Sequence, residues 1–354
     1  MQRDYSLVGE TAQRAIDTGL ATADWYHTDI DRKEMKALMQ RSDAPAIRDT
    51  FILFALMISV ATVAIYLMPS WWSAPFWLIY GVLYGSAMDS RWHECGHGTA
   101  FKTRKYNDML YQVASFCMMR NPIEWRWSHA RHHTDTVIVG RDPEIAIMRP
   151  VRFLSLLLKY MGLIQGFSGI VSILKYSMGK MNPAVESFIP EQERKKVFGV
   201  ARIWLTIYVF TIVASLYFSS WIPVLLIGAP TIYGAWHHVL TGFLQHGGLA
   251  ENVIDHRLNS RTVYMNQINR FIYWNMNYHV EHHMFPMVPY HQLPKLHEKI
   301  KHDLPPANTS IFDGYKEVLP ALWKQSTDPD FFVIRRLPAT ARPYRADLHQ
   351  QALG

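Results

Sequence analysis

Apolar and polar stretches alternate along the chain, and four apolar stretches are each about long enough to cross a bilayer as a helix. They cover residues 50–68, 71–89, 203–219 and 222–246. Because the link inside each successive pair is short, we predict two helical hairpins and an all-α integral membrane protein. The last stretch predicts one long helix, which Gly228, Pro230 and Gly234 can bend.

The polar stretches set out the rest of the chain. Residues 1–49 are charged and in part amphipathic, so we predict a cytoplasmic N-terminal segment. Residues 50–304 are expected to form the membrane domain, and residues 305–354 a cytoplasmic segment that ends in a loose basic tail. Residues 153–174 are apolar too, but Lys159 and several small residues favour a helix lying in the membrane interface over a fifth span.

The distribution of charge sets the expected orientation. The net charge is +7, yet residues 51–90 and 203–256 contain no Lys or Arg. Cationic residues confined to the flanking segments follow the positive-inside pattern of membrane proteins, which we favour over nucleic-acid binding. Both hairpin turns should therefore lie outside. Both termini and the active site should lie on the cytoplasmic side of a bacterial-type inner membrane.

Histidines are the most informative polar residues. The chain has 17 of them, and eight gather in three clusters with spacings of three and four residues. The clusters are His93 and His97; His129, His132 and His133; and His279, His282 and His283. On a helix this spacing returns side chains to one face, as metal binding requires. A catalytic zinc takes three protein ligands and a structural zinc four, so eight histidines indicate at least two ions. Imidazole alone does not choose among zinc, copper, iron and nickel.

The first cluster supports a different interpretation as well. His93, Glu94 and His97 match H-E-x-x-H, the helical signature of zinc proteases, so a zinc-dependent intramembrane hydrolase is one alternative. A non-enzymatic metal carrier is another, although a carrier is expected to place its ligands within the spans. The histidines found inside apolar stretches are His237, His238 and His246. The roles of His237, His238 and His256 stay open.

The three clusters lie in the segments HECGHGTAF, RWSHARHHTDT and NYHVEHHMFPMVPYHQLPKLH. From about residue 50 to residue 300 the chain thereby resembles the integral-membrane fatty acid desaturase and hydroxylase superfamily. The resemblance implies four transmembrane helices under a cytoplasmic cap that holds two non-heme irons on the eight clustered histidines. His246, in FLQHGG, matches a ligand that the family often has near the end of the fourth span. Some acyl-CoA desaturases have an Asn one turn earlier that holds a water on iron. Gly242 stands there in this chain, which leaves the second iron's coordination open.

The resemblance also implies a reaction. An alkyl C–H bond has no acidic proton, so a redox cofactor rather than a side chain must supply the oxidant. We expect two ferrous ions to activate O2 for hydrogen abstraction from a fatty acid or acyl-lipid chain, giving a desaturated chain. Hydroxylation is one alternative. Oxidative decarboxylation of a free fatty acid to a terminal 1-alkene is another, because the superfamily includes bacterial alkene-forming decarboxylases of about this size.

Electrons are expected from a separate protein. The sequence shows no H-P-G-G heme motif, and its two cysteines are too few for an iron–sulfur cluster or a disulfide framework. A ferredoxin, a rubredoxin or a cytochrome, with its reductase, would be the external donor. The basic cytoplasmic face suits an acidic partner.

Further candidate residues flank the histidine clusters. Glu94, Asp135 and Glu281 are expected to orient imidazoles as hydrogen-bond acceptors, and we place Glu94 and Asp135 in the catalytic set. Arg131 and Arg141 are candidates for binding a substrate headgroup, with structural ion pairing as the alternative. Aromatic residues could line a tunnel for the acyl chain, with core packing as the alternative for each: Trp92, Phe101, Tyr111, Phe116 and Trp274.

Overall fold

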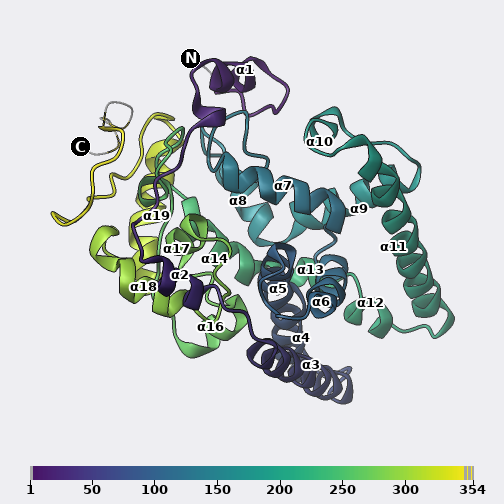
Figure 1. Cartoon of the computed structure of the whole chain (residues 1–354). Coiled ribbons are helices and arrows are strands. Elements are labelled where there is room, and N and C mark those ends of the chain that lie inside the picture. The colour runs from purple at the N-terminus through teal and green to yellow at the C-terminus, as the bar shows by residue number, and fades with distance from the viewer. Residues whose placement is uncertain (1–2, 347–348, 350–351, 353–354) are drawn as a thin grey trace.

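The computed structural model describes residues 3–346, 349 and 352 (Figure 1). Every regular element within these residues is helical, apart from two isolated β-bridges, Thr262 with Tyr278 and Val263 with Asn308. The prediction of an all-α fold is therefore confirmed for the described chain.

Two helices are long and apolar enough to cross a membrane. They are the segment Arg32–Tyr66, which contains α3 (Asp43–Tyr66), and α11 (Glu191–Tyr217). Figure 1 shows α3 and α11 at two edges of the molecule. Large apolar side chains on both helices, such as Phe51 and Phe210, are exposed, as expected of helices that face lipid. These helices correspond to the first and third predicted spans.

The second predicted span lies in an unbroken helical stretch from residue 74 to residue 97. It consists of α4 (Ala74–Gly81), a π-helical turn η3 (Val82–Ser86) and α5 (Ala87–His97). All five residues of the π-helical turn are buried. The stretch ends at Gly98, whose φ of 71° is left-handed and suits a glycine cap. This stretch positions the first histidine cluster beyond the apolar residues.

The fourth predicted span is not one helix, and that expectation was wrong. It is divided into α12 (Ile222–Leu226), α13 (Pro230–Tyr233) and α14 (Ala235–His246). Pro230 lies in the first turn of α13, where its missing N–H costs nothing. Gly234 packs so closely on α4 that a Cβ there would lie 2.0 Å from the Gly81 carbonyl oxygen. Gly228, Pro230 and Gly234, which were expected to bend one long helix, lie where that helix is interrupted. The number of four membrane spans stays a prediction.

The apolar stretch between the hairpins is also bent. It forms α8 (Phe153–Tyr160) and α9 (Leu163–Ser177), which meet at an angle of 74°. Gly162 at the bend has a φ of +70° and packs against the backbone of Ile232. Length and apolarity would also allow the pair to be one broken span, so its interfacial position stays a prediction.

The remaining helices surround these elements. Those that position the histidines or close the cap are α6 (Arg104–Cys117), α7 (Pro122–Thr134), α15 (His256–Asn259), α16 (Gln267–Tyr273), α17 (His279–Met284), α18 (Leu293–Ile300) and α19 (Ile311–Gln325). Shorter peripheral elements are α1 (Glu10–Asp17), α2 (Arg32–Leu38), α10 (Pro183–Glu186) and the 3-10 turns η1 (Leu20–Thr22), η2 (Trp71–Ser73) and η4 (Lys301–Asp303). Figure 1 shows α14 and α16–α19 grouped together, next to the C-terminal segment.

The described part of the C-terminal tail is not loose. Arg335 is buried and pairs with Glu317 at 3.3 Å. The Arg342 backbone N–H donates to Asp303, and its guanidinium pairs with Asp29 at 2.7 Å. The tail is thus tied to both the cap and the N-terminal segment. The expectation of a loose tail also covers residues 347–348, 350–351 and 353–354, which lie outside the described residues.

Candidate metal centre

Four helices bring all nine of the singled-out histidines together in two groups. Helix α5 carries two of them, α7 three, α14 one and α17 three. The five-histidine cluster contains His93, His97, His129, His133 and His282. The four-histidine cluster contains His132, His246, His279 and His283. Within each cluster the available nitrogen atoms lie within 4.8 Å of one another.

Ring nitrogens face one another inside both clusters. In the five-histidine cluster, the Nε2 atoms of His97 and His129 are 3.0 Å apart, and those of His133 and His282 are 3.2 Å apart. In the four-histidine cluster, His279 Nε2 lies 3.0 Å from His246 Nε2. A metal that binds nitrogen at 2.0–2.1 Å holds two ligands at right angles about 2.9 Å apart. The spacing therefore suits one cation in each cluster.

Two carboxylates hold the outer edges of two imidazoles. Glu144 lies 2.8 Å from His129 Nδ1, and Asp142 lies 2.9 Å from His132 Nδ1. Both acids come from one turn that follows α7. Because the carboxylates accept from Nδ1–H, the Nε2 lone pairs of these rings are directed at the clusters, which is the tautomer that metal binding needs.

Two further imidazoles are held in the same manner by uncharged oxygens. His246 Nδ1 lies 2.7 Å from the Asn259 carbonyl, which can only accept. His283 Nδ1 lies 3.3 Å from the Thr136 hydroxyl, which itself donates to the His132 carbonyl. One ring of the five-histidine cluster and three of the four-histidine cluster thus have a defined tautomer.

The surroundings keep most of these rings neutral. Burial, reinforced by His132, lowers the pKa of His97 to about 4. Burial also holds the pKa of His93, His129 and His282 well below the ordinary value. His132 differs: burial acts to lower its pKa, but the Asp142 carboxylate, which also hydrogen-bonds the ring, and Glu144 together outweigh burial and raise it. Neutral imidazoles present lone pairs, so the donor set fits cations of the kind that imidazole binds, among them iron, zinc, copper and nickel.

The carboxylates expected to orient imidazoles do not contact the metal-centre histidines. Glu94 is fully buried, and it accepts from the Thr99 hydroxyl at 2.7 Å and from the Tyr290 N–H at 2.9 Å. Burial raises the pKa of Glu94 to about 7. Glu281 accepts from the Thr262 hydroxyl and pairs with His297, which belongs to neither cluster.

Asp135 and the two predicted headgroup arginines bind one another. Asp135 is buried and lies 3.0 Å from the Arg141 guanidinium and 3.8 Å from that of Arg131. Both arginines therefore form structural ion pairs, which was the alternative to binding a substrate headgroup. The structure places neither of them on the cavity described next, and Asp135 contacts no imidazole of the described chain.

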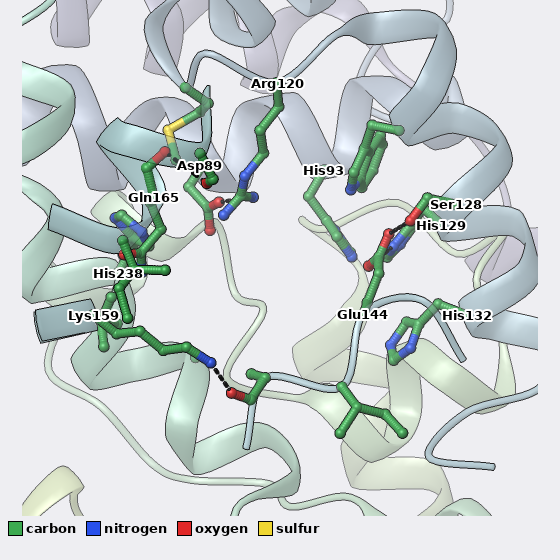
Figure 2. A pocket seen from close by; sticks show the side chains of 18 of the residues that line it. Asp89, His93, Arg120, Ser128, His129, His132, Glu144, Lys159, Gln165 and His238 are labelled. Atoms are coloured by element: carbon green, nitrogen blue, oxygen red, sulfur yellow. Dashed lines mark hydrogen bonds and ion pairs between the residues drawn. The ribbon is translucent and has the colours of Figure 1, made fainter. Parts of the chain in front are cut away.

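A cavity of about 490 Å³ adjoins both clusters. The cluster histidines that line it are His93, His129, His132, His246 and His279. Figure 2 shows His93, His129, His132 and Glu144 on one side, with Asp89, Arg120, Lys159, Gln165 and His238 across the opening. Gly242 also lines the cavity, and a Cβ there would meet nothing within 4 Å.

Of the aromatic residues expected along a tunnel, Trp92 lines this cavity and the others pack elsewhere. Trp274 stacks on Tyr290 with ring centroids 4.2 Å apart, and Phe116 stacks on Tyr208 at 5.0 Å. Sequence reasoning missed the cationic residues that do line the cavity, Arg120, Arg149 and Lys159. A signal for Lys159 was available, because it is the single Lys or Arg in the apolar residues 153–174.

Comparison with known proteins places these residues in a family context. The model of a family described as fatty acid desaturase matches residues 69–315. An omega-6 fatty acid desaturase of Glycine max is 31% identical over 111 residues, which are 30% of this chain and 28% of that protein. An acyl-lipid omega-3 desaturase (cytochrome b5) of Arabidopsis thaliana is 24% identical over 288 residues, covering 75% of this chain and 72% of that protein. A delta(12)-oleate desaturase of Trichosanthes kirilowii is 21% identical over 284 residues, covering 71% and 75%.

Proposed function

The chain belongs to the fatty acid desaturase family, and we propose that it is a membrane-bound oxidoreductase that removes hydrogen from an aliphatic acyl chain with O2. The convergence of nine imidazoles from four helices on two clusters beside one cavity carries this proposal. The cavity adjoins both clusters, so one acyl chain could lie against both.

The protein's own residues would hold and orient the cofactor. The five-histidine cluster would bind one iron and the four-histidine cluster the other. Irons bound there would supply the O2-derived oxidising power that side chains lack. Asp142 and Glu144 fix the proton of one ring in each cluster, and both of these rings, His132 and His129, are buried.

The electron balance requires a reductant. Desaturation takes two hydrogens from neighbouring carbons, and O2 becomes two waters only if two further electrons and two protons are supplied. We propose that a separate ferredoxin, rubredoxin or cytochrome supplies these electrons. A cytochrome b5 is named for the Arabidopsis relative.

A second candidate reaction is oxidative decarboxylation of a free fatty acid. Loss of a hydrogen β to the carboxylate, together with CO2, leaves a terminal alkene. O2 becomes two waters when two electrons and three protons are supplied, the third proton because the substrate enters as a carboxylate. The observation that favours it is a cationic side chain inside the cavity, Lys159. Hydroxylation would begin with the same hydrogen abstraction.

The zinc-hydrolase alternative fits the geometry less well. A catalytic zinc takes three protein ligands and leaves Glu free as a general base. Here His93 and His97 share a cluster with three other imidazoles, and Glu94 is engaged by Thr99 and Tyr290.

We propose that the protein resides in a membrane with its metal centre on the cytoplasmic side. Exposed apolar side chains along α3 and α11 support membrane insertion. The names of several relatives place them in the endoplasmic reticulum or chloroplast of plants, so a bacterial-type inner membrane stays a prediction.

Product analysis tests the proposed function. Iron-loaded protein in lipid nanodiscs, with a ferredoxin and its reductase, is supplied separately with a free fatty acid, an acyl-CoA and a phospholipid. Products are identified by mass spectrometry, with headspace sampling for volatile alkenes. We expect O2-dependent oxidation of one class, its loss in His282→Ala, and its retention in His302→Ala, an exposed histidine outside both clusters. Absence of product from all three classes, or full activity of His282→Ala, would refute the proposal.

A further inference from the structure

Lys159 is the one cation on the cavity wall without a carboxylate partner among the described residues. The other two are paired: Arg120 lies 2.9 Å from Asp89, and Arg149 lies 3.5 Å from Glu251. Within the described chain, Lys159, on α8, donates only to the Ala146 carbonyl oxygen. An ammonium group that is partly removed from water and has no counter-charge is unfavourable unless an anion joins it.

Unpartnered polar atoms lie on the same side of the cavity. His238, on α14, is only 7% exposed, and neither of its ring nitrogens has a hydrogen-bond partner within the described chain. The Gln165 side-chain oxygen, on α9, is likewise buried and unpartnered. Figure 2 shows Lys159, Gln165 and His238 facing the cavity across from His93 and His132. Leaving buried polar groups without a hydrogen-bond partner is unfavourable, which points to a polar ligand at this wall.

We propose that Lys159 and His238 bind the carboxylate of a free fatty acid inside the cavity. This inference rests on the proposed function, in which an acyl chain is the substrate, and specifies its headgroup. The Lys159 ammonium would donate to one carboxylate oxygen, and the N–H of neutral His238 to the other. The Gln165 amide can turn about its last torsion to present its NH2 group as a further donor.

The dimensions of the cavity favour a single-chain acid. A volume of about 490 Å³ lies in the usual range for one small ligand, and a single acyl chain falls within that range. One ammonium also matches the single charge of a carboxylate. Because this wall and the imidazoles share one cavity, oxidation should fall near the carboxyl end of the chain.

Equilibrium binding without O2 tests the site independently of turnover. Iron-loaded protein in nanodiscs is titrated with radiolabelled dodecanoic acid and, separately, with its methyl ester. We expect Lys159→Met to weaken binding of the acid about tenfold or more and leave binding of the ester unchanged. Lys159→Arg should retain most of the affinity for the acid. Lys175→Met, at an exposed lysine on α9 outside the cavity, should change neither affinity.

Several outcomes would overturn the inference. Lys159→Met could bind the acid as tightly as the parent, or lose acid and ester equally while keeping its iron. A diacyl phosphatidate could displace the labelled acid from the parent protein but not bind Lys159→Met. That result would identify a lipid phosphate, and not a carboxylate, as the ligand of this site. If the acid requires Lys159 for binding but the iron-loaded protein oxidises no chain, the proposed function fails and the carboxylate site stands.

Discussion

Asp142 and Glu144 lie on one short turn and each holds an imidazole of a different cluster. The turn is itself tied down, since Asp142 accepts from the backbone N–H groups of Val137 and Glu144, each at 2.7 Å. A shift of this turn would therefore disturb both clusters at once. The two carboxylates also place a negative charge behind His129 and His132. This charge makes each neutral ring a better ligand for a cation.

Removing either carboxylate should weaken metal binding. We expect Asp142→Asn and Glu144→Gln each to lower the metal affinity roughly 10–100-fold, because the imidazole loses an anionic acceptor and becomes a poorer ligand. Metal retained at graded chelator concentrations measures this. Asp135→Asn is the matched control, since its carboxylate contacts arginines. Equal metal retention by all three variants would show that these carboxylates do not tune the site.

Glu124, which also lines the cavity, gives stability a pH dependence. Burial raises the pKa of its carboxyl from 4.5 to about 7, against the opposing hydrogen bond from Tyr176. Between these pH values the folded protein holds more protons than the unfolded chain, so the free energy of unfolding falls as pH rises, by about 3 kcal/mol in all.

The variant Glu124→Gln should remove that dependence. We expect it to be more stable than the parent at pH 8 and nearly equal to it at pH 5, as measured by thermal unfolding in detergent at both pH values. The same difference in stability at both pH values would contradict a raised carboxyl pKa in the folded protein.

The histidines could be predicted from the sequence and their carboxylate partners could not. Spacings of three and four return side chains to one helix face, and this periodicity is visible in the printed chain. Adjacent residues on a helix point in different directions, which is why Glu94, next to His93, contacts no imidazole of the clusters. Asp142 and Glu144 lie 10 and 15 residues after their histidines, in a turn without periodicity.

At the scale of elements, the interruption of the fourth apolar stretch is the main departure from expectation. Apolarity reports that residues 222–246 avoid water, but not that the backbone breaks within them. The break comes from tertiary contact, because Gly234 lies against Gly81 of α4 and Pro230 starts a new helix. As a result α14 is a separate short helix, and it ends at His246 in the four-histidine cluster.

The Gly81–Gly234 contact can be tested with paired glycine substitutions. We expect Gly234→Ala to destabilise the protein by about 1–3 kcal/mol, because its Cβ would lie 2.0 Å from the Gly81 carbonyl oxygen. Gly199→Ala on α11 is the control, since a Cβ there meets nothing within 4 Å and Ala favours a helix. Melting temperatures in detergent compare the two variants. A Gly234→Ala protein as stable as Gly199→Ala would argue against this close helix crossing.

At the scale of the whole molecule, the charge pattern and the exposed apolar helices agree on membrane insertion. The sequence could give the all-α class, because its apolar stretches are long and uncharged. The number of spans could not be predicted from the sequence. Two helices are long and apolar enough to cross a membrane, and the α8–α9 pair is bent by 74°. Bending and breaking depend on contacts between distant residues, such as Gly162 with Ile232.

Orientation can be measured with single cysteines. Both native cysteines are buried, so background labelling should be low. We expect cysteines at Ser70 and Ser219, in the two predicted outer turns, to react with a membrane-impermeant maleimide added to intact cells. A cysteine at the exposed Thr327 should react only after lysis. The reverse pattern would invert the proposed orientation.

The metal content of the purified chain tests the central claim most directly. Two clusters of five and four imidazoles should hold about two irons per chain, and His97→Ala and His279→Ala, one in each cluster, should each lower the iron content to about one or less. Elemental analysis after expression in iron-sufficient medium provides the measurement. One zinc per chain without iron, or an iron content unchanged in both variants, would contradict a two-iron centre built from these histidines.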